Sequence, residues 1–297
     1  MSLARLAAMV CKVFPWLLLL LVVPASVADG LNQATTPVFG DNFVAQYGAD
    51  GHHLVDQGKE VTLTMDQSTG AGFRSKSEYG SGFFHLRFKI PSGYTAGVVT
   101  TFYLISQPED SGRDEVDFEF LGDVDGKPVT VQTNVIINGR SFREQRLHLW
   151  FDPAADFHDY KILWNPFQLM MFVDDTPVRV FRNMTGTVAG YEYPSKKTML
   201  IRGSLWDGSS WATGGGRLTV DWSKGPFNAS YRGFAIDGCA AEACDYPGLW
   251  WNGGEYRAIT DAQRAAYKGV KRKYMVYNYC TDTRRFNNHM PPECYGT

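Results

Sequence analysis

The sequence predicts an all-β fold, a sandwich or a barrel, followed by a C-terminal segment that contains a helix. Stretches of alternating apolar and polar residues recur every 8–12 residues or so, separated by turn-forming residues, and this spacing is typical of sandwiches and barrels. No internal repeat or low-complexity linker divides the 297 residues. The pattern changes only after Cys239, where cysteines and a helical pattern appear.

The expected strands are of two kinds. Most alternate, as a strand with one buried face does, whereas residues 97–105 form a near-continuous apolar run, which is typical of a strand covered on both faces. Loops are expected at residues 68–72 and 107–112, where turn-forming residues cluster. The other expected strands are residues 60–66, 84–90, 114–120, 129–136, 147–151, 160–164, 169–173, 178–181 and 199–204.

The C-terminal segment carries a helix signal. Thr260 and Gln263 have the spacing of a capping box, so a helix is expected from Thr260 through about Tyr274. One more strand is expected at residues 274–279.

The candidate functional centre is the expected strand at residues 114–120, which reads Asp-Glu-Val-Asp-Phe-Glu-Phe. Successive side chains on a strand point to opposite faces, so Glu115, Asp117 and Glu119 share one face and the apolar residues share the other. Neighbouring carboxylates raise each other's pKa because like charges disfavour the ionised form. A solvated acidic face is the alternative interpretation, but such faces usually carry interspersed Lys or Arg.

A row of carboxyl groups suits glycoside hydrolysis. A retaining glycosidase needs two carboxyl groups about 5–5.5 Å apart, and an inverting one needs them about 6.5–9.5 Å apart. Residues four apart on a strand begin about 13 Å apart, so Glu115 and Glu119 would have to lean toward each other over Asp117. The spacing alone does not choose between the two geometries.

The acidic motif, extended through Gly122, closely resembles the signature of plant xyloglucan endotransglucosylase/hydrolases in glycoside hydrolase family 16. The resemblance covers nearly all of the chain from about Val38 onward. It implies a curved β-jelly-roll sandwich, concanavalin-like, with an open groove across its concave face and a C-terminal extension that contains a helix and disulfides. The other segments that carry the resemblance are residues 79–85, 96–104, 132–134, 143–146, 149–153, 204–207, 211–213, 221–227, 277–282 and 291–294.

The resemblance implies a retaining endo-transglucosylase. Glu115 would be the nucleophile, Glu119 the acid/base and Asp117 a residue that assists the nucleophile. The enzyme would cleave the β-1,4-glucan backbone of xyloglucan and transfer it to another glucan chain end, which remodels the plant cell wall. No metal and no organic cofactor is expected.

Four further residues are candidate substrate contacts from their positions. Gln132 and Asn134 share one face of their expected strand and are expected to border the acidic row, although an exposed polar strand face is the alternative. Trp206 and Trp211 bracket a Gly/Ser-rich loop, which suits stacking on sugar rings better than core packing.

The resemblance adds Tyr103, Arg146 and Arg285, which with Trp211 would form a long acceptor site. The C-terminal extension would lengthen the acceptor side of the cleft, and Arg285 would face the acceptor sugar. A surface arginine is the alternative interpretation of Arg285. The segment between Tyr193 and Trp206 is short, without the insertion of the hydrolytic branch, so transfer is favoured over hydrolysis.

Three other functions remain open. One is a predominantly hydrolytic xyloglucanase, and another is a heterotransglucosylase that uses mixed-linkage glucan or cellulose. The third is a non-catalytic glucan-binding lectin on the same fold, since a fold does not fix a function. The crowded carboxyl groups argue against the lectin, which gains nothing from them.

The N-terminus has the pattern of a secretory signal peptide. Arg5 and Lys12 supply positive charge, residues 13–23 are almost wholly apolar, and small residues allow cleavage after Ala28. A membrane anchor is the alternative, but the apolar run is short for a span of about 20 residues. We therefore expect a secreted protein of the cell wall or apoplast, with no membrane attachment after cleavage. The expected domains are the signal peptide at 1–28, the family 16 sandwich at 29–235 and the extension at 236–297.

Charge and cysteine content agree with this location. The formal net charge of −2 argues against a nucleic-acid partner, and a monomer acting on polysaccharide is expected. Four cysteines outside the signal peptide read as two disulfides, and sequence proximity favours pairing Cys239 with Cys244 and Cys280 with Cys294. Zinc is the alternative, although no Cys-His spacing supports it.

Two sequons predict glycosylation; they begin at Asn183 and Asn228.

Overall fold

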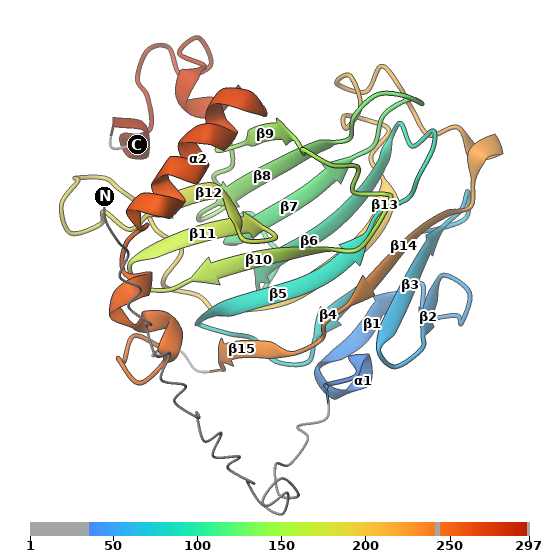
Figure 1. The fold of residues 1–297 in the computed structure, drawn as a ribbon, viewed down its shortest axis with the longest axis horizontal. Helices are drawn as coiled ribbons and strands as arrows, with labels where there is room; N and C mark the ends of the chain where they lie inside the picture. Colours follow the sequence, from blue (N-terminus) through green and yellow to red (C-terminus); the bar gives the residue numbers. More distant parts are fainter. Residues whose placement is uncertain (1–35, 241–243, 296–297) are drawn as a thin grey trace, which may run out of the picture. The chain divides into compact units, whose positions relative to one another are not determined.

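The structure is a computed structural model, and it describes residues 36–240 and 244–295. The expected signal peptide and its cleavage site lie outside the described residues. Within the described part of the chain, two eight-stranded antiparallel sheets form the fold (Figure 1). The predicted all-β sandwich is therefore confirmed.

The first sheet contains the acidic strand near its middle. Its order is β1 (Phe43–Tyr47), β4 (Ala71–Ser75), β13 (Met199–Asp207), β6 (Val98–Ser106), β7 (Glu115–Leu121), β8 (Thr130–Ile136), β9 (Gln145–His148) and β16 (Met275–Asn278).

The second sheet covers one face of the first. Its order is β12 (Thr176–Arg182), β11 (Gln168–Val173), β10 (His158–Trp164), β5 (Ser81–Lys89), β14 (Phe227–Arg232), β3 (Glu60–Met65) and β2 (Leu54–Asp56), and β15 (Ile236–Cys239) also pairs with β5. The α-helices are α1 (Phe39–Asn42) and α2 (Asp261–Lys273), and short 3₁₀ turns lie at Trp222–Lys224, Trp250–Asn252, Gly254–Tyr256, Tyr279–Thr281 and Pro292–Tyr295.

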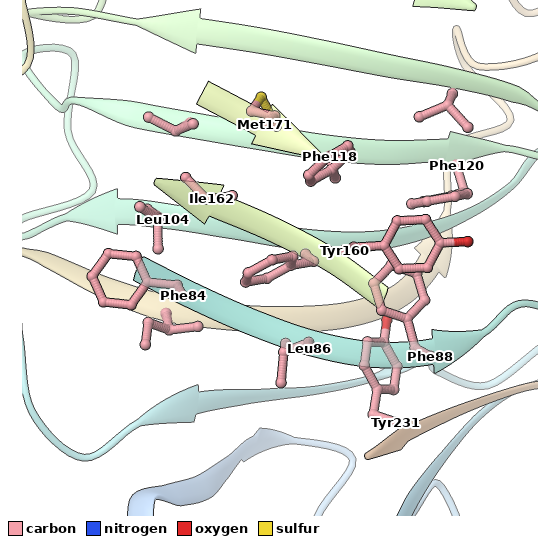
Figure 2. Packing of buried hydrophobic residues seen from close by; sticks show 14 of the residues in the cluster. Phe84, Leu86, Phe88, Leu104, Phe118, Phe120, Tyr160, Ile162, Met171 and Tyr231 are labelled. Atoms are coloured by element: carbon pink, nitrogen blue, oxygen red, sulfur yellow. The ribbon is translucent and has the colours of Figure 1, made fainter. Parts of the chain in front are cut away.

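Aromatic side chains join the two sheets. Phe118 and Phe120 of β7 are almost fully buried, and Phe120 packs on Phe88 and Tyr160 of the second sheet with ring centroids 5.1 and 4.9 Å apart (Figure 2). The Phe88 and Tyr160 rings lie 4.1 Å apart. Because these apolar side chains occupy the core face of β7, the acidic side chains of the same strand are directed to the opposite, open face.

The C-terminal segment completes both sheets. After the sandwich strands, β15 adds to β5 of the second sheet and β16 adds to β9 of the first. Helix α2 lies against β12 (Figure 1), and Thr260 and Gln263 form the predicted capping box at its start. The segment is therefore continuous with the hydrogen bonding of the sandwich.

The two predicted disulfides are present. Cys239 is bonded to Cys244 and Cys280 to Cys294, so all four cysteines outside the expected signal peptide are used and the zinc alternative fails. The second bridge lies just after β16 and links the end of that strand to the last described turn.

Several element boundaries differ from expectation. Residues 68–72 were expected to be a loop, but Ala71 and Gly72 begin β4. Gly72 is in the strand because the ring of Tyr47 from β1 packs over it, where an added Cβ would come within 2.4 Å of that ring. The expected strand at 147–151 ends at His148, and strands β1, β2, β14 and β15 were not predicted.

The aromatic contact between the sheets predicts a stability cost. Phe88→Ala should lower the free energy of unfolding by about 3–5 kcal/mol, because it removes a fully buried ring from a packed core. Urea denaturation followed by tryptophan fluorescence measures this. Phe142→Ala is the control, since that ring is 53% exposed, and equal losses in the two variants would contradict the packing argument.

Candidate active site

The open face of the first sheet carries a hollow centred on β7. Its lining includes Glu115, Asp117 and Glu119, and its volume is about 140 Å³. The predicted sharing of one strand face by these three residues is therefore confirmed. The remaining lining residues come from the neighbouring strands β6 and β13; they are Thr101, Tyr103, Ser204 and Trp206.

Strand register places the polar candidates on both sides of the acidic row. On β8, Asn134 lies opposite Asp117 and Gln132 lies opposite Glu119. On β6, Tyr103 lies opposite Asp117. The prediction that the amides of Gln132 and Asn134 border the acidic row is thus confirmed by the pairing of β7 with β8.

A chain of hydrogen bonds ends at Glu119. Gln132 Nε2 donates to Glu119 Oε2 at 2.6 Å, and Arg146 Nε donates to Gln132 Oε1 at 2.7 Å. Burial, assisted by the charge of Glu115, raises the pKa of Glu119 to about 7, while the hydrogen bond from Gln132 and the charge of Arg146 oppose the rise. A carboxyl group with such a pKa can give and take a proton near neutral pH, as general acid–base catalysis requires.

Asp117 is shielded from solvent between the two glutamates. Burial raises its pKa well above the ordinary value, and the charges of Glu115 and Glu119 and a hydrogen bond with Glu115 act in the same direction. A protonated Asp117 carboxyl can therefore donate its hydrogen bond to Glu115.

Glu115 is held by an ion pair that the sequence analysis missed. Arg113 Nε donates to Glu115 Oε2 at 2.5 Å. The sequence could have predicted this ion pair, because Arg113 lies two residues before Glu115 and residues two apart on an extended chain share a face. The acidic stretch from Asp114 to Gly122 contains no basic residue, and Arg113 immediately precedes it.

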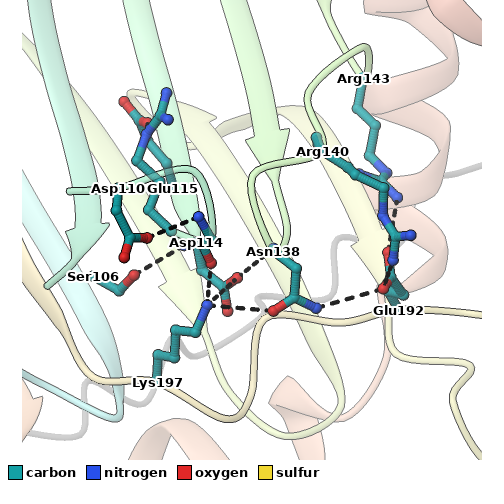
Figure 3. Close-up of polar contacts among 11 residues, drawn as sticks. Ser106, Asp110, Asp114, Glu115, Asn138, Arg140, Arg143, Glu192 and Lys197 are labelled. Carbon is teal, nitrogen blue, oxygen red and sulfur yellow. Dashed lines mark hydrogen bonds and ion pairs between the residues drawn. The ribbon is translucent and has the colours of Figure 1, made fainter. Parts of the chain in front are cut away.

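A second polar network anchors the start of β7, and it was also missed (Figure 3). Asp114 is buried, and its Oδ1 accepts from the backbone N–H of Asn138 at 2.7 Å and faces Lys197 Nζ at 3.5 Å. The Asp114 backbone N–H donates to Ser106 Oγ at 2.9 Å. These contacts fix the point at which the strand bearing Glu115 begins.

The network continues toward the C-terminal extension (Figure 3). Asn138 Nδ2 donates to Glu192 Oε1 at 3.5 Å, and Glu192 also pairs with Arg140 and Arg143. Arg143 Nε in turn donates to Glu293 Oε1 at 2.6 Å, and Glu293 is buried beside Cys294. Polar contacts therefore connect the acidic strand with the disulfide-bonded end of the chain.

The two candidate tryptophans lie together at the hollow. Their ring centroids are 6.1 Å apart, and both rings are half-buried against Val99, Leu121 and Ala212. Trp206 belongs to strand β13, whereas we expected both residues to flank a loop; only Trp211 lies beyond the strand. The strand position directs Trp206 onto the open face with Ser204.

Arg146 and Arg285 lie on either side of Tyr277. The Arg146 guanidinium is 5.7 Å from the Tyr277 ring, and Arg285 donates to the Tyr277 hydroxyl at 2.9 Å. Arg285 also forms a two-contact ion pair with Glu144, at 2.8 and 3.2 Å. The structure thus brings these two candidates together at the β9–β16 edge, with Arg285 already engaged by a carboxylate.

The remaining candidates are placed as follows. Burial raises the pKa of Tyr103 to about 12, so its hydroxyl stays protonated and lies in contact with Arg202. Of the sequon residues, Asn228 is exposed on β14 and Asn183 is half-buried after β12. The described residues contain no group of three or more His, Cys, Asp or Glu side chains that could hold a metal ion.

Comparison with known proteins identifies the family. Residues 39–224 match the family described as glycosyl hydrolases family 16, and residues 246–294 match the one described as xyloglucan endo-transglycosylase (XET) C-terminus. The chain belongs to glycosyl hydrolase family 16, in its xyloglucan endotransglucosylase/hydrolase branch. The family predicted from the acidic motif is confirmed.

Among family 16 relatives, two proteins of Arabidopsis thaliana illustrate the similarity. Putative xyloglucan endotransglucosylase/hydrolase protein 1 is 48% identical over 90% of this chain and 89% of its own length. Xyloglucan endotransglucosylase/hydrolase protein 3 is 44% identical over 96% of this chain and 98% of its own length.

Solved structures show the shared fold. A Bacillus licheniformis beta-glucanase has a TM-score of 0.51 at 24% identity, covering 64% of this chain and 89% of its own. The Apo Crh5 transglycosylase has a TM-score of 0.52 at 24% identity, covering 68% of this chain and 81% of its own. These similarities confirm the jelly-roll architecture of the sandwich.

The hydrogen bond from Gln132 predicts a measurable pKa change. Because the amide N–H stabilises the ionised form of Glu119, Gln132→Leu should raise the pKa of Glu119 above about 7. Titration of ¹³C-labelled glutamate carboxyls by NMR measures this, with Glu119→Gln assigning the resonance. Gln46→Leu, a change outside this hydrogen-bond chain, should leave the titration unaltered. An unchanged or lower pKa in Gln132→Leu would contradict the proposed effect.

Proposed function

We propose that the protein is a retaining endo-transglucosylase that cleaves the β-1,4-glucan backbone of xyloglucan and joins the cleaved chain to another glucan chain end. The observation that carries this proposal is the row of Glu115, Asp117 and Glu119 on the open face, in which burial raises the pKa of Glu119 to about 7. The substrate class follows the names of relatives that are 44–48% identical over most of the chain.

In the first half-reaction, Glu115 attacks the anomeric carbon as that carbon's bond to the glycosidic oxygen breaks. Protonated Glu119 gives its proton to the leaving oxygen. A covalent glycosyl-enzyme results, in which Glu115 is an ester. Protonated Asp117, hydrogen-bonded to Glu115, steadies the nucleophile and limits charge repulsion within the row.

In the second half-reaction, the ionised Glu119 takes a proton from the hydroxyl of an acceptor sugar. The acceptor oxygen bonds to the anomeric carbon, the ester bond breaks and its electron pair returns to the Glu115 carboxylate. Retention follows from the two displacements. No step requires a group other than the side chains and the two glucan chains.

The choice between sugar and water as acceptor depends on how well the site holds a sugar. Arg146, Tyr277 and Arg285 line one edge of the sheet on the Glu119 side of the cleft, where they extend the surface available to an acceptor chain. Trp206 and Trp211 offer a ring surface beside the carboxyls. We therefore favour transfer, with hydrolysis as a side activity.

We also infer that the protein acts outside the cell, in the plant cell wall. The N-terminal pattern supports secretion, and the two disulfides suit an oxidising compartment. The exposed sequon at Asn228 is the more accessible of the two for glycosylation. No helix of the described residues is long and apolar enough to cross a membrane.

A polymer assay separates transfer from the alternatives. The secreted protein is incubated with high-mass xyloglucan, with and without fluorescent xyloglucan oligosaccharides, while polymer size, reducing ends and label incorporation are followed together. We expect label to enter the polymer with few new reducing ends. A fall in size matched by rising reducing ends, whether or not label is present, would show a hydrolase instead.

The same assay tests the lectin alternative through one substitution. Glu115→Ala should abolish label incorporation, because it removes the nucleophile. A lectin would show no chemistry before the substitution either, and would keep its affinity for glucan after it. Mixed-linkage glucan and cellulose replace xyloglucan as donors if the first polymer gives no transfer.

The ion pair at the nucleophile predicts a kinetic effect. Arg113→Met should lower kcat/KM for transfer by about 10- to 100-fold, since a charge-assisted hydrogen bond contributes about 1.5–3 kcal/mol. Arg113→Lys should recover part of the loss. Arg232→Met breaks an Arg–Glu pair on the second sheet and is the control. If Arg113→Met matched that control, the positioning role would be wrong.

A further inference from the structure

A second hollow lies on the first sheet, on the side of β7 away from β9 and β16. It has a volume of about 360 Å³, and its lining comes from β1, β4, β13 and the segments that follow β4 and β6. Cross-strand pairing connects it to the acidic row: Arg74 lies opposite Arg202, Arg202 opposite Tyr103, and Tyr103 opposite Asp117. Three strand spacings, roughly 14 Å, therefore separate Arg74 from Asp117.

Positive charge predominates in this second hollow. Among the described residues its charged lining consists of Arg74, Lys76 and Arg202 against a single carboxylate, Glu78. Arg202 forms an ion pair with Glu109 at the rim, and Glu78 accepts a hydrogen bond from Thr198. The three cationic side chains therefore exceed the two carboxylates, Glu78 and Glu109, by one positive charge.

Arg74 has no carboxylate partner within ion-pair distance in the described part of the chain. Its guanidinium donates to the carbonyl of Ser75 at 3.1 Å, which leaves most of its five N–H groups for another acceptor. Lys76, which is exposed, donates to the carbonyl of Gly40. Two cationic side chains are thus held by neutral carbonyl groups beside a hollow.

Arg202 shows that the hollow is built around a buried charge. The residue is 3% exposed, and its Nε has no hydrogen-bond partner among the described residues. Its guanidinium also lies 6.0 Å from the Tyr103 ring. Like charges directly opposite on a sheet destabilise it, so the Arg74–Arg202 pair carries a cost that an anion between them would offset.

We propose that this second hollow is a subsite for a carboxylate carried by the glucan, that is, a hexuronic acid residue in the chain bound on this side of the acidic row. A guanidinium binds a carboxylate through two parallel hydrogen bonds, which suits two arginines on adjacent strands. A neutral sugar at the same place would desolvate these cations without a counter-charge. The proposal deepens the proposed function, because it specifies the substrate class of the same cleft.

The decisive experiment compares one donor that carries carboxylates with two neutral donors. They are neutral xyloglucan, xyloglucan whose terminal galactose C6 hydroxyls have been oxidised to carboxylates, and the oxidised polymer with its carboxyls reduced back to alcohols. A neutral fluorescent oligosaccharide is the acceptor for all three. We expect the wild type to use the carboxylate donor about tenfold more efficiently than its reduced form, and added salt to shrink this preference.

Variants assign the preference to the hollow. Arg74→Gln should bring the carboxylate-to-reduced ratio of kcat/KM close to one, and Lys76→Gln should lower it less because Lys76 is exposed. Arg232→Gln, on the second sheet, should retain the wild-type ratio. A wild-type ratio near one, or a loss in Arg74→Gln that is equal for all donors, would overturn the proposal.

A binding measurement keeps this test separate from that of the proposed function. Glu115→Gln protein is titrated calorimetrically with the carboxylate polymer and with its reduced form, which requires no turnover. Tighter binding of the carboxylate form that is lost on adding Arg74→Gln supports the subsite even if the enzyme transfers no xyloglucan. Equal binding of the two forms refutes the subsite even if transfer is efficient.

Discussion

The burial of Phe118 and Phe120 between the two sheets is the interaction on which the site depends. Successive residues of a strand point to opposite faces, so placing these rings on Phe88 and Tyr160 obliges Glu115, Asp117 and Glu119 to share the open face. Burial, and next the charges of the neighbouring carboxyl groups, then raise the pKa of Asp117 and of Glu119. The free energy gained by aromatic packing thus offsets the electrostatic repulsion among the three carboxyl groups.

The C-terminal extension and the acidic strand behave as parts of one structure. Strands β15 and β16 add to different sheets, and the polar network from Asp114 through Glu192 and Arg143 ends at Glu293 beside a disulfide. Arg146 makes the same connection from the other side, through Gln132 to Glu119 and across to Tyr277. The extension therefore sets both the shape of one end of the cleft and the surroundings of the acid/base candidate.

Charge is distributed unevenly across the open face. At the β16 edge Arg285 is neutralised by Glu144, and Arg146 is tied to Gln132. At the opposite end Arg74 donates to the backbone carbonyl of Ser75 and has no ion-pair partner among the described residues, beside the buried Arg202. The two ends of the cleft consequently differ in the substituents that they can accommodate on a bound glucan.

Sequence reasoning was sufficient to predict the fold class, the acidic face of β7, the family, both disulfides and the capped helix, because each depends on residues close together in the chain or on a period of two. It also indicated that Gln132 and Asn134 border the carboxyls. The hydrogen-bond partners of Glu119, by contrast, follow from the tertiary structure. The chain Arg146–Gln132–Glu119 depends on strand register across three strands, and the pairing of Arg74 with Arg202 joins residues far apart in sequence. The short strands β1 and β4 also escaped prediction; Gly72 of β4 lies under the ring of Tyr47 from β1, a contact between segments that are apart in the sequence.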